Sequence, residues 1–194
     1  LATPLLCAIP NIATTTRLFP SFSLLTCIQL SLILAASISF RSAKSVTRKG
    51  LANTKWTGRL EIINWKNKNI LVDSAHNSLA AEVLANERKN WINQDKGVFW
   101  IIGVQKHKDI NMIIKKLIHK IDTVLLVPVP NQESWSLNEL TKIMDYKLNN
   151  FTEFKDFKDA LNYLRSLDEW PKCFPVLTGS IFLVSEFIKY SQIN

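Results

Sequence analysis

The chain has 194 residues, which is enough for one domain-sized hydrophobic core and part of a second. Its formal net charge is +8, and the excess of basic residues lies in the first 60 residues, which contain seven Lys or Arg and no acidic residue. Residues 61–194 hold the other 17 basic residues and all 16 acidic ones. This distribution excludes a uniformly basic nucleic-acid-binding surface, so we expect no nucleic-acid partner.

The cysteine and histidine content argues against a metal-stabilised fold. Cys7, Cys27 and Cys173 are far apart and odd in number, a pattern typical of buried thiols in a reducing compartment. The three histidines add no spacing that resembles a zinc site. We therefore expect no protein-bound structural metal and a cytoplasmic location.

The first distinctive segment covers residues 21–40, which carry no charge and are followed at once by Arg41 and Lys44. Its length would allow a membrane-spanning helix, and the lack of acidic residues would suit a transit peptide. Six Ser or Thr residues and a Gln dilute its hydrophobicity, however. A helix that packs inside a larger protein is the interpretation we prefer, which makes residues 1–55 the remnant of a preceding domain plus a linker. We expect no membrane partner.

From residue 45 onward, short apolar runs alternate with helical segments. A helical turn at 45–51 and a connector at 52–55 come first. The predicted strands cover residues 59–65, 69–73, 97–104, 123–129, 151–153 and 174–177. The predicted helices cover residues 77–91, 109–120, 137–147, 155–167 and 180–191. This alternation predicts a Rossmann-like α/β domain over residues 56–194, with a mostly parallel sheet, helices on both faces and an antiparallel edge hairpin.

Helix periodicity predicts which side chains face the core. In the helix at 77–91 the expected apolar stripe is Leu79, Val83, Leu84 and Trp91. In the helix at 109–120, capped by Asp109, the apolar side consists of Ile110, Ile113, Ile114 and Leu117. Ser136 is the expected cap of the helix at 137–147.

Polar clusters follow three of the predicted strands. His76 and its neighbours follow the strand at 69–73, Lys108 follows the strand at 97–104, and Ser180 follows the strand at 174–177. Each has an ordinary explanation by itself: a structural histidine, a solvated lysine and a helix cap. Because parallel strands end at one edge of a sheet, where open α/β sheets bind ligands, their convergence predicts a site. The chain has no Gly-x-Gly-x-x-Gly fingerprint for a dinucleotide.

Four segments then resemble a known family. WTGRLE at 56–61, ILVDSAHN at 70–77, IIGVQKHKDI at 101–110 and VLTGSIFLV at 176–184 resemble the C-terminal domain of folylpolyglutamate synthase and dihydrofolate synthase, in the Mur ligase superfamily. The resemblance covers roughly residues 48–194. The departures from the family pattern are Thr57 and Ser78 in place of proline, Ser74 in place of glycine and His107 in place of aspartate.

The resemblance implies an ATP-dependent amide ligase, acting as a monomer, that adds L-glutamate to folate or to dihydropteroate through an acyl phosphate. It implies ATP and Mg²⁺ as cofactors, with most metal ligands in a central domain. The implied site residues are Arg59, Asp73 and Asn77 for ATP, Lys108 and His76 for the reaction, and His76 and Ser180 for the incoming glutamate.

A phosphate-binding loop of the form Gly-x-x-x-x-Gly-Lys-Ser/Thr is missing from the sequence. We therefore expect residues 1–55 to be the remnant of a central ATPase domain and this polypeptide alone to be catalytically inactive. Two alternatives remain open. One is a membrane-tethered α/β nucleotide-binding module without ligase activity, in which residues 21–40 span the bilayer. The other is a decayed or incompletely read gene product that folds without a role.

Overall fold

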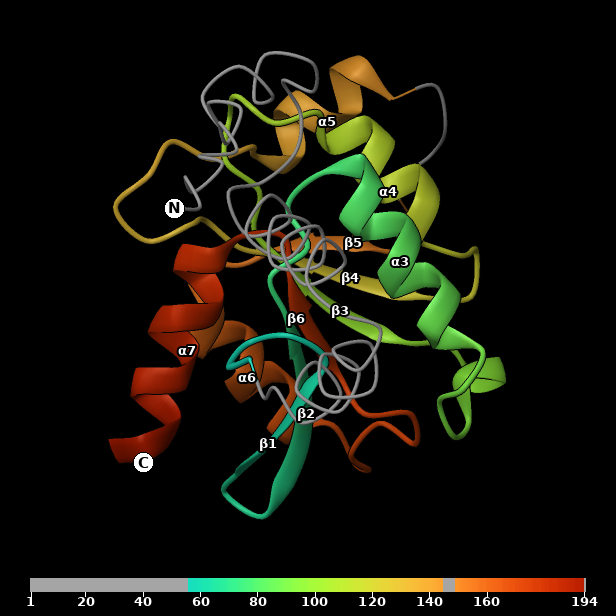
Figure 1. Cartoon of the computed structure of the whole chain (residues 1–194), viewed down its shortest axis with the longest axis vertical. Coiled ribbons are helices and arrows are strands. Elements are labelled where there is room, and N and C mark those ends of the chain that lie inside the picture. The colour runs from blue at the N-terminus through green and yellow to red at the C-terminus, as the bar shows by residue number, and fades with distance from the viewer. Residues whose placement is uncertain (1–55, 145–148, 194) are drawn as a thin grey trace, which may run out of the picture. The chain divides into compact units, whose positions relative to one another are not determined.

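The computed structural model describes residues 56–144 and 149–193 of the chain (Figure 1). The predictions for residues 1–55, including the turn at 45–51, the connector at 52–55 and the three interpretations of residues 21–40, lie outside the described residues. Within them, no helix combines the length and the apolar character that crossing a lipid bilayer requires.

A six-stranded sheet in the order β1-β2-β6-β3-β4-β5 forms the centre of the domain (Figure 1). The strands are β1 Glu61–Trp65, β2 Lys68–Asp73, β3 Phe99–Ile102, β4 Thr123–Leu126, β5 Phe151–Glu153 and β6 Val176–Thr178. Only the β1–β2 pair is antiparallel, and it lies at one edge. The predicted mostly parallel sheet with an antiparallel edge hairpin is confirmed.

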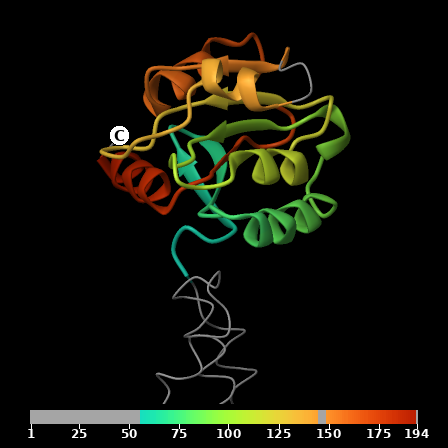
Figure 2. The same ribbon diagram turned by 90° about the horizontal axis from the view of Figure 1, so that it is seen from above.

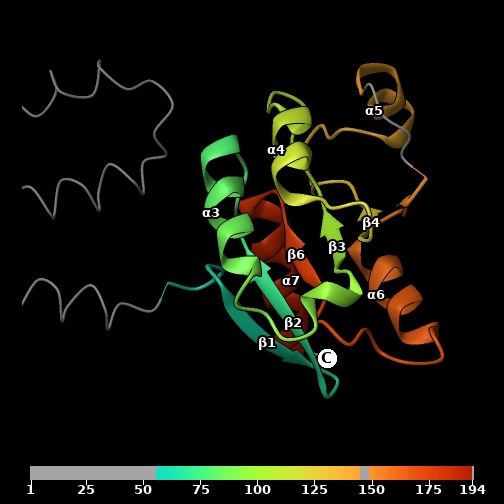
Figure 3. The same ribbon diagram turned by 90° about the vertical axis from the view of Figure 1, so that its right-hand side faces the viewer.

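Helices cover both faces of this sheet (Figures 2 and 3). They are α3 Ser78–Arg88, α4 Ile110–Leu117, α5 Leu137–Ile143, α6 Phe157–Ser166 and α7 Ile181–Ile193, with a short 3₁₀ turn η2 at Gln94–Lys96. Side chains of α3, α4 and α5 pack into the core on one face, and those of α6 and α7 pack into the core on the other.

Strand β3 is apolar at every position because both faces of the sheet are covered there. Along β3, Trp100 and Ile102 belong to one core and Ile101 belongs to the other, and all three are fully buried. Alternate strand residues point to opposite faces, so a continuously apolar run is required here. The α/β prediction rested on such runs, and the structure confirms it.

The predicted stripe of α3 is wrong in two positions. Leu79 and Val83 are more than half exposed, whereas Ala81, Leu84 and Arg88 are buried. The core-facing side of the helix is therefore rotated relative to the apolar pattern, because a buried arginine rather than a hydrophobic residue completes it. Of the three predicted stripe residues that lie in α3, only Leu84 belongs to the buried core.

Helix α3 also ends earlier than predicted, at Arg88. Trp91 lies beyond it and packs its ring against Trp100 at 5.9 Å and Phe174 at 5.6 Å between centroids. It therefore reaches the core from a turn. The hairpin turn is also tighter than predicted, since it consists of Lys66 and Asn67, which both adopt a left-handed backbone, and strand β2 already begins at Lys68.

Candidate functional site at the carboxyl edge of the sheet

The three polar clusters that follow β2, β6 and β3 meet at one edge of the sheet. Strand β6 lies between β2 and β3 and pairs with both, and the register places Thr178 opposite both Asp73 and Ile102. The amide of Gly103 donates a hydrogen bond of 3.2 Å to the carbonyl of Thr178. The convergence predicted from the sequence is thus confirmed at the level of the strands.

Two glycines allow the loops after β6 and β3 to approach each other closely. Gly179 has a φ of +102°, and a Cβ there would lie 2.6 Å from the carbonyl oxygen of Gly103. A Cβ on Gly103 would in turn lie 2.8 Å from the carbonyl oxygen of Val127. Because neither contact tolerates a side chain, this part of the edge is built from backbone packed on backbone.

Asp73 ends strand β2 and holds the loop that carries Arg59. Its Oδ2 accepts a hydrogen bond from the amide of Leu60 at 3.0 Å, and its Oδ1 accepts one from the amide of Ala75 at 2.8 Å. The Arg59 guanidinium lies 3.7 Å from Oδ1. Burial raises the pKa of Asp73 above its ordinary value, although the Leu60 amide, Arg59 and the Ala75 amide each act to lower it.

The Arg59 loop begins with a tight turn. The amide of Arg59 donates a hydrogen bond of 3.2 Å to the carbonyl of Trp56, and Gly58 between them has a φ of +75°. These are the features of a type II turn. A Cβ on Gly58 would lie 2.7 Å from Val184, so the turn packs closely against α7. The side chain of Arg59 itself stays 27% exposed.

Ser74 makes a contact that the sequence did not predict. Its amide and its hydroxyl both donate hydrogen bonds of 3.0 Å to the carbonyl of Gly58. Ser74 is buried and does not belong to the described residues with a left-handed backbone. The position is therefore free of the conformational demand that would require glycine, and no feature of the sequence pattern signals its bond to Gly58.

His76 and Asn77 follow Asp73 at the start of α3. The Nδ1 of His76 lies 2.8 Å from the carbonyl of Ser74, which can only accept a hydrogen bond, so Nδ1 carries the hydrogen. In the neutral ring, Nε2 then has a lone pair that can accept a hydrogen bond from another group. The Oδ1 of Asn77 caps α3 by accepting from the amide of Ala80 at 2.8 Å. The structure thus gives Asn77 a capping role, with its amide NH₂ as the part left for a ligand.

Lys108 lies in the loop between β3 and α4. Its carbonyl accepts a hydrogen bond of 3.1 Å from the indole of Trp135. Its ammonium forms no ion pair with any residue of the described part of the chain. Its neighbour Lys106 instead pairs with Glu139 and lies 4.2 Å above the ring of Trp135. Of the two lysines in this loop, Lys108 is therefore the one without an ion-pair partner among the described residues.

Ser180 precedes helix α7 and is 1% exposed. Its Oγ accepts a hydrogen bond of 3.2 Å from the amide of Phe182. The hydroxyl hydrogen is not used in that bond and remains available to a ligand carboxylate. The six predicted site residues thus lie at one edge of the sheet, Asp73 as the last residue of β2 and the others outside the strands. The side chains of Asp73, His76, Asn77 and Ser180 make hydrogen bonds within the domain.

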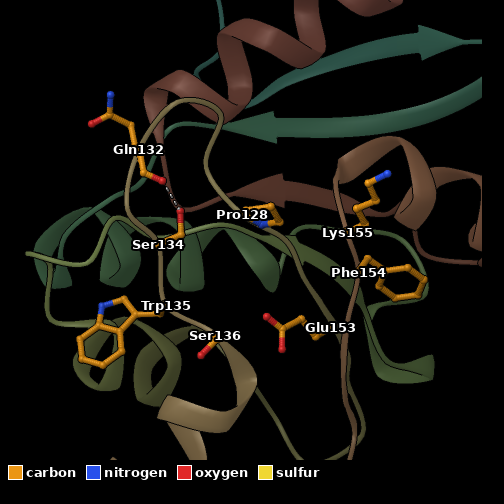
Figure 4. Close-up of a pocket in the computed structure, with 8 residues that line it drawn as sticks. All are labelled: Pro128, Gln132, Ser134, Trp135, Ser136, Glu153, Phe154 and Lys155. Carbon is orange, nitrogen blue, oxygen red and sulfur yellow. Dashed lines mark hydrogen bonds between the residues drawn. The ribbon is translucent and has the colours of Figure 1, made fainter.

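A cleft of about 540 Å³ opens further along the same edge, where β4 and β5 end (Figure 4). None of the predicted site residues lines it. The hydroxyl of Ser134 there donates to the carbonyl of Gln132 and accepts from the amide of Val129. The lining residues are Pro128, Gln132, Ser134, Trp135, Ser136, Glu153, Phe154 and Lys155.

Metal coordination has little support within residues 56–144 and 149–193. No three or more His, Cys, Asp or Glu side chains come together there in a way that could hold an ion. Magnesium commonly uses one or two carboxylates together with substrate phosphates. A magnesium ion that is bound together with ATP therefore needs fewer protein ligands than such a cluster would supply.

The family model for the C-terminal domain of dihydrofolate synthetase matches residues 58–190, which include every predicted site residue. The chain belongs to this family. A dihydrofolate synthase/folylpolyglutamate synthase from Buchnera aphidicola is 29% identical over 153 residues, which are 77% of this chain and 35% of that protein.

Solved structures of this dihydrofolate synthetase family share the fold. The folylpolyglutamate synthase of Thermotoga maritima matches with a TM-score of 0.60 and 27% identity, over 79% of this chain and 34% of that one. A bifunctional folylpolyglutamate synthase/dihydrofolate synthase from Yersinia pestis, complexed with AMPPNP and a Mn ion, matches with a TM-score of 0.60 and 21% identity, over 78% and 34%. The chain spans about one third of the length of these relatives.

Proposed function

We propose that this chain supplies one wall of the active site of an ATP-dependent amide ligase that adds L-glutamate to folate or to dihydropteroate. The observation that carries the proposal is the arrangement of Arg59 and Lys108 on one sheet edge, in a chain of the dihydrofolate synthetase family. The guanidinium of Arg59 is partly exposed, and the ammonium of Lys108 has no ion-pair partner among the described residues. Two cations without a tight protein partner suit an anionic ligand such as the ATP phosphates.

The proposed reaction has two steps. The γ-phosphoryl group of ATP passes to a carboxylate of the folate substrate, which gives an acyl phosphate and ADP. The amine of L-glutamate then attacks the acyl carbon, the carbon–nitrogen bond forms, and inorganic phosphate leaves. Charge builds up on phosphoryl and carbonyl oxygens in both steps, so fixed cations are the main catalytic device. In the proposal Arg59 holds the ATP phosphates and Lys108 stabilises the transferring group.

The remaining residues bind and orient. The two lone pairs on each oxygen of Asp73 leave acceptor capacity beyond its two amide contacts, which fits a ribose hydroxyl. The Nε2 of His76 and the hydroxyl hydrogen of Ser180 are assigned to the incoming glutamate. Asn77 orients the nucleotide through its NH₂ group. Mg²⁺ accompanies ATP in this proposal and would neutralise charge on the ATP phosphates.

The experiment is an NMR titration of the 194-residue chain with ATP and, separately, with L-glutamate. We expect ATP to shift the signals of Arg59, Asp73 and Lys108, and L-glutamate to shift those of His76 and Ser180. Lys108→Ala should weaken ATP binding about tenfold, because one charge-assisted contact is lost.

Lys106→Ala is the matched control, since it removes a lysine from the same loop whose ammonium is already paired with Glu139. Equal losses from the two variants would indicate a general response to charge and would contradict the proposed role of Lys108. Formation of ADP with dihydropteroate and glutamate tests the reaction itself, and we expect it only when the rest of the ligase is present.

A further inference from the structure

The backbone around Arg59 is held at three points. The turn bond between Arg59 and Trp56 closes one side, at 3.2 Å. The Gly58 amide donates to the carboxylate of Glu61 at 2.7 Å. The amide of Leu60, which has a left-handed φ of +44°, donates to Asp73. A non-glycine residue in that conformation is strained, so these contacts must hold the loop in place.

A further contact comes from a side chain with no assigned role. The carbonyl of Gly58, directly before Arg59, accepts from both the amide and the hydroxyl of Ser74. The amide contact would be present with any residue at position 74 except proline, but the hydroxyl contact exists only because position 74 is a serine. It is buried, so water does not replace it readily when the hydroxyl is removed.

We infer that Ser74 is a positioning residue, whose hydroxyl fixes the Gly58 carbonyl and thereby the direction in which the loop presents Arg59. The inference rests on the proposed phosphate-binding role of Arg59 for its functional meaning. Its structural content, a hydroxyl that orders the 58–60 loop, is independent of that role.

The turn itself shows why such a contact is useful. Thr57 occupies the second position of the type II turn, where proline is favoured because its ring fixes φ near the required value. The amide of Thr57 donates no hydrogen bond among the described residues, so a proline there would cost none. Threonine leaves the turn more freedom in the unfolded ensemble. The hydrogen bond from the Ser74 hydroxyl, which lies outside the turn, restrains the loop where the threonine does not.

The experiment measures amide hydrogen exchange by NMR in the full chain and in three variants: Ser74→Ala, Thr57→Pro, and the two combined. We expect Ser74→Ala to speed exchange of the Arg59 and Leu60 amides by about two- to tenfold, as loss of one hydrogen bond predicts. Exchange of the Ile101 and Leu125 amides in the centre of the sheet should not change. Thr57→Pro should slow exchange in the loop, and the combined variant should return it towards the original rate.

Ser134→Ala is the matched control, because its hydroxyl also donates to a loop carbonyl but on the other side of β3. Unchanged loop exchange in Ser74→Ala would overturn the inference. So would equal acceleration at loop and sheet amides, since that would reflect a loss of global stability only. ATP titration of the same variants separates the two proposals: local acceleration without any ATP response in the parent chain would refute the role of Arg59 while supporting that of Ser74.

Discussion

Two buried aspartates, each with an arginine partner, lie at opposite ends of the strands in the same sheet: Asp122 at the amino end and Asp73 at the carboxyl end. Asp122 immediately precedes β4, and its carboxylate binds both terminal nitrogens of Arg88, at 2.5 and 2.7 Å. Asp73 ends β2, and its nearest arginine nitrogen, from Arg59, lies 3.7 Å away. The side chains of Arg88 and Asp122 are 2% and 0% exposed, whereas that of Arg59 is 27% exposed.

The two carboxylates differ in what surrounds them. Asp122 also accepts from the indole of Trp100 and from the amides of Val98 and His119. Burial alone would raise the pKa of Asp122, but the hydrogen bonds, led by those from Arg88, lower it below its ordinary value. At Asp73 the opposing contacts are fewer, so burial prevails and the pKa is raised.

The difference separates a structural ion pair from an arginine that is available to a ligand. The buried guanidinium of Arg88 makes a bidentate ion pair with the carboxylate of Asp122, which few ligands could displace. Arg59 is held near Asp73 mainly through the backbone amide of the neighbouring Leu60, and its side chain is partly exposed to solvent. We expect substitutions to affect stability at the first pair and ligand binding at the second.

The largest expected effect is that of Asp122→Asn. The change leaves Arg88 buried without a countercharge and should lower the free energy of unfolding by about 3–5 kcal/mol. Chemical denaturation followed by far-UV circular dichroism measures it. Glu82→Gln, in the exposed Lys116–Glu82 pair, is the control and should change the value by less than about 1 kcal/mol. Similar losses from both variants would contradict a special role for the buried pair.

A smaller, functional effect is expected from Arg59→Ala. Because its guanidinium is only loosely paired, the free energy of unfolding should fall by less than about 1 kcal/mol. ATP affinity should fall about tenfold or more, since a charge-assisted contact to phosphate is lost. Calorimetric titration measures the affinity, with Lys189→Ala on exposed helix α7 surface as the control. A large loss of stability without loss of ATP binding would assign Arg59 to the structural class.

The smallest effect is one of pH, and the two aspartates should show it with opposite signs. Asp122, with a lowered pKa, contributes stability above pH 3.8 that is lost as the pH falls through its folded-state pKa. Asp73, with a raised pKa, contributes stability below pH 3.8 that is lost as the pH rises through its folded-state pKa. Carbon-13 NMR titration of the two carboxyl groups should find Asp73 above 3.8 and Asp122 below it. The reverse order would overturn the comparison.

The sequence predicts the sheet and the convergence of its loops because both depend on local patterns. The alternation of apolar runs and helices predicts parallel strands that are joined by helical crossovers. Polar residues that directly follow such strands therefore lie at the same edge of the sheet, where the carboxyl ends of the strands meet. The placement of His76 and Lys108 at this edge could therefore be predicted without coordinates, whereas Arg59 precedes β1 and is predicted from the family resemblance.

The ion pair between the buried Arg88 and Asp122 could not be predicted from the sequence. The two residues are 34 positions apart, and neither lies in a recognisable motif. The same limit applies to Leu79 and Val83, whose exposure depends on how Arg88 rotates α3. The bond from Ser74 to Gly58 is likewise a tertiary contact that periodicity does not report. Where a polar residue takes a core position, hydrophobic patterning misplaces its neighbours as well.

The position of β6 has a consequence for how the domain forms. This strand is synthesised last, yet it pairs with β2 on one side and with β3 on the other, so those two strands have no direct contact in the sheet. During translation, the backbone groups of β2 and β3 that pair with β6 have no strand partner until residues 176–178 have been synthesised. Such distant pairing slows folding and prolongs the exposure of apolar strands to aggregation. We therefore expect the edge that gathers Arg59, Lys108 and Ser180 to be among the last parts of the domain to form.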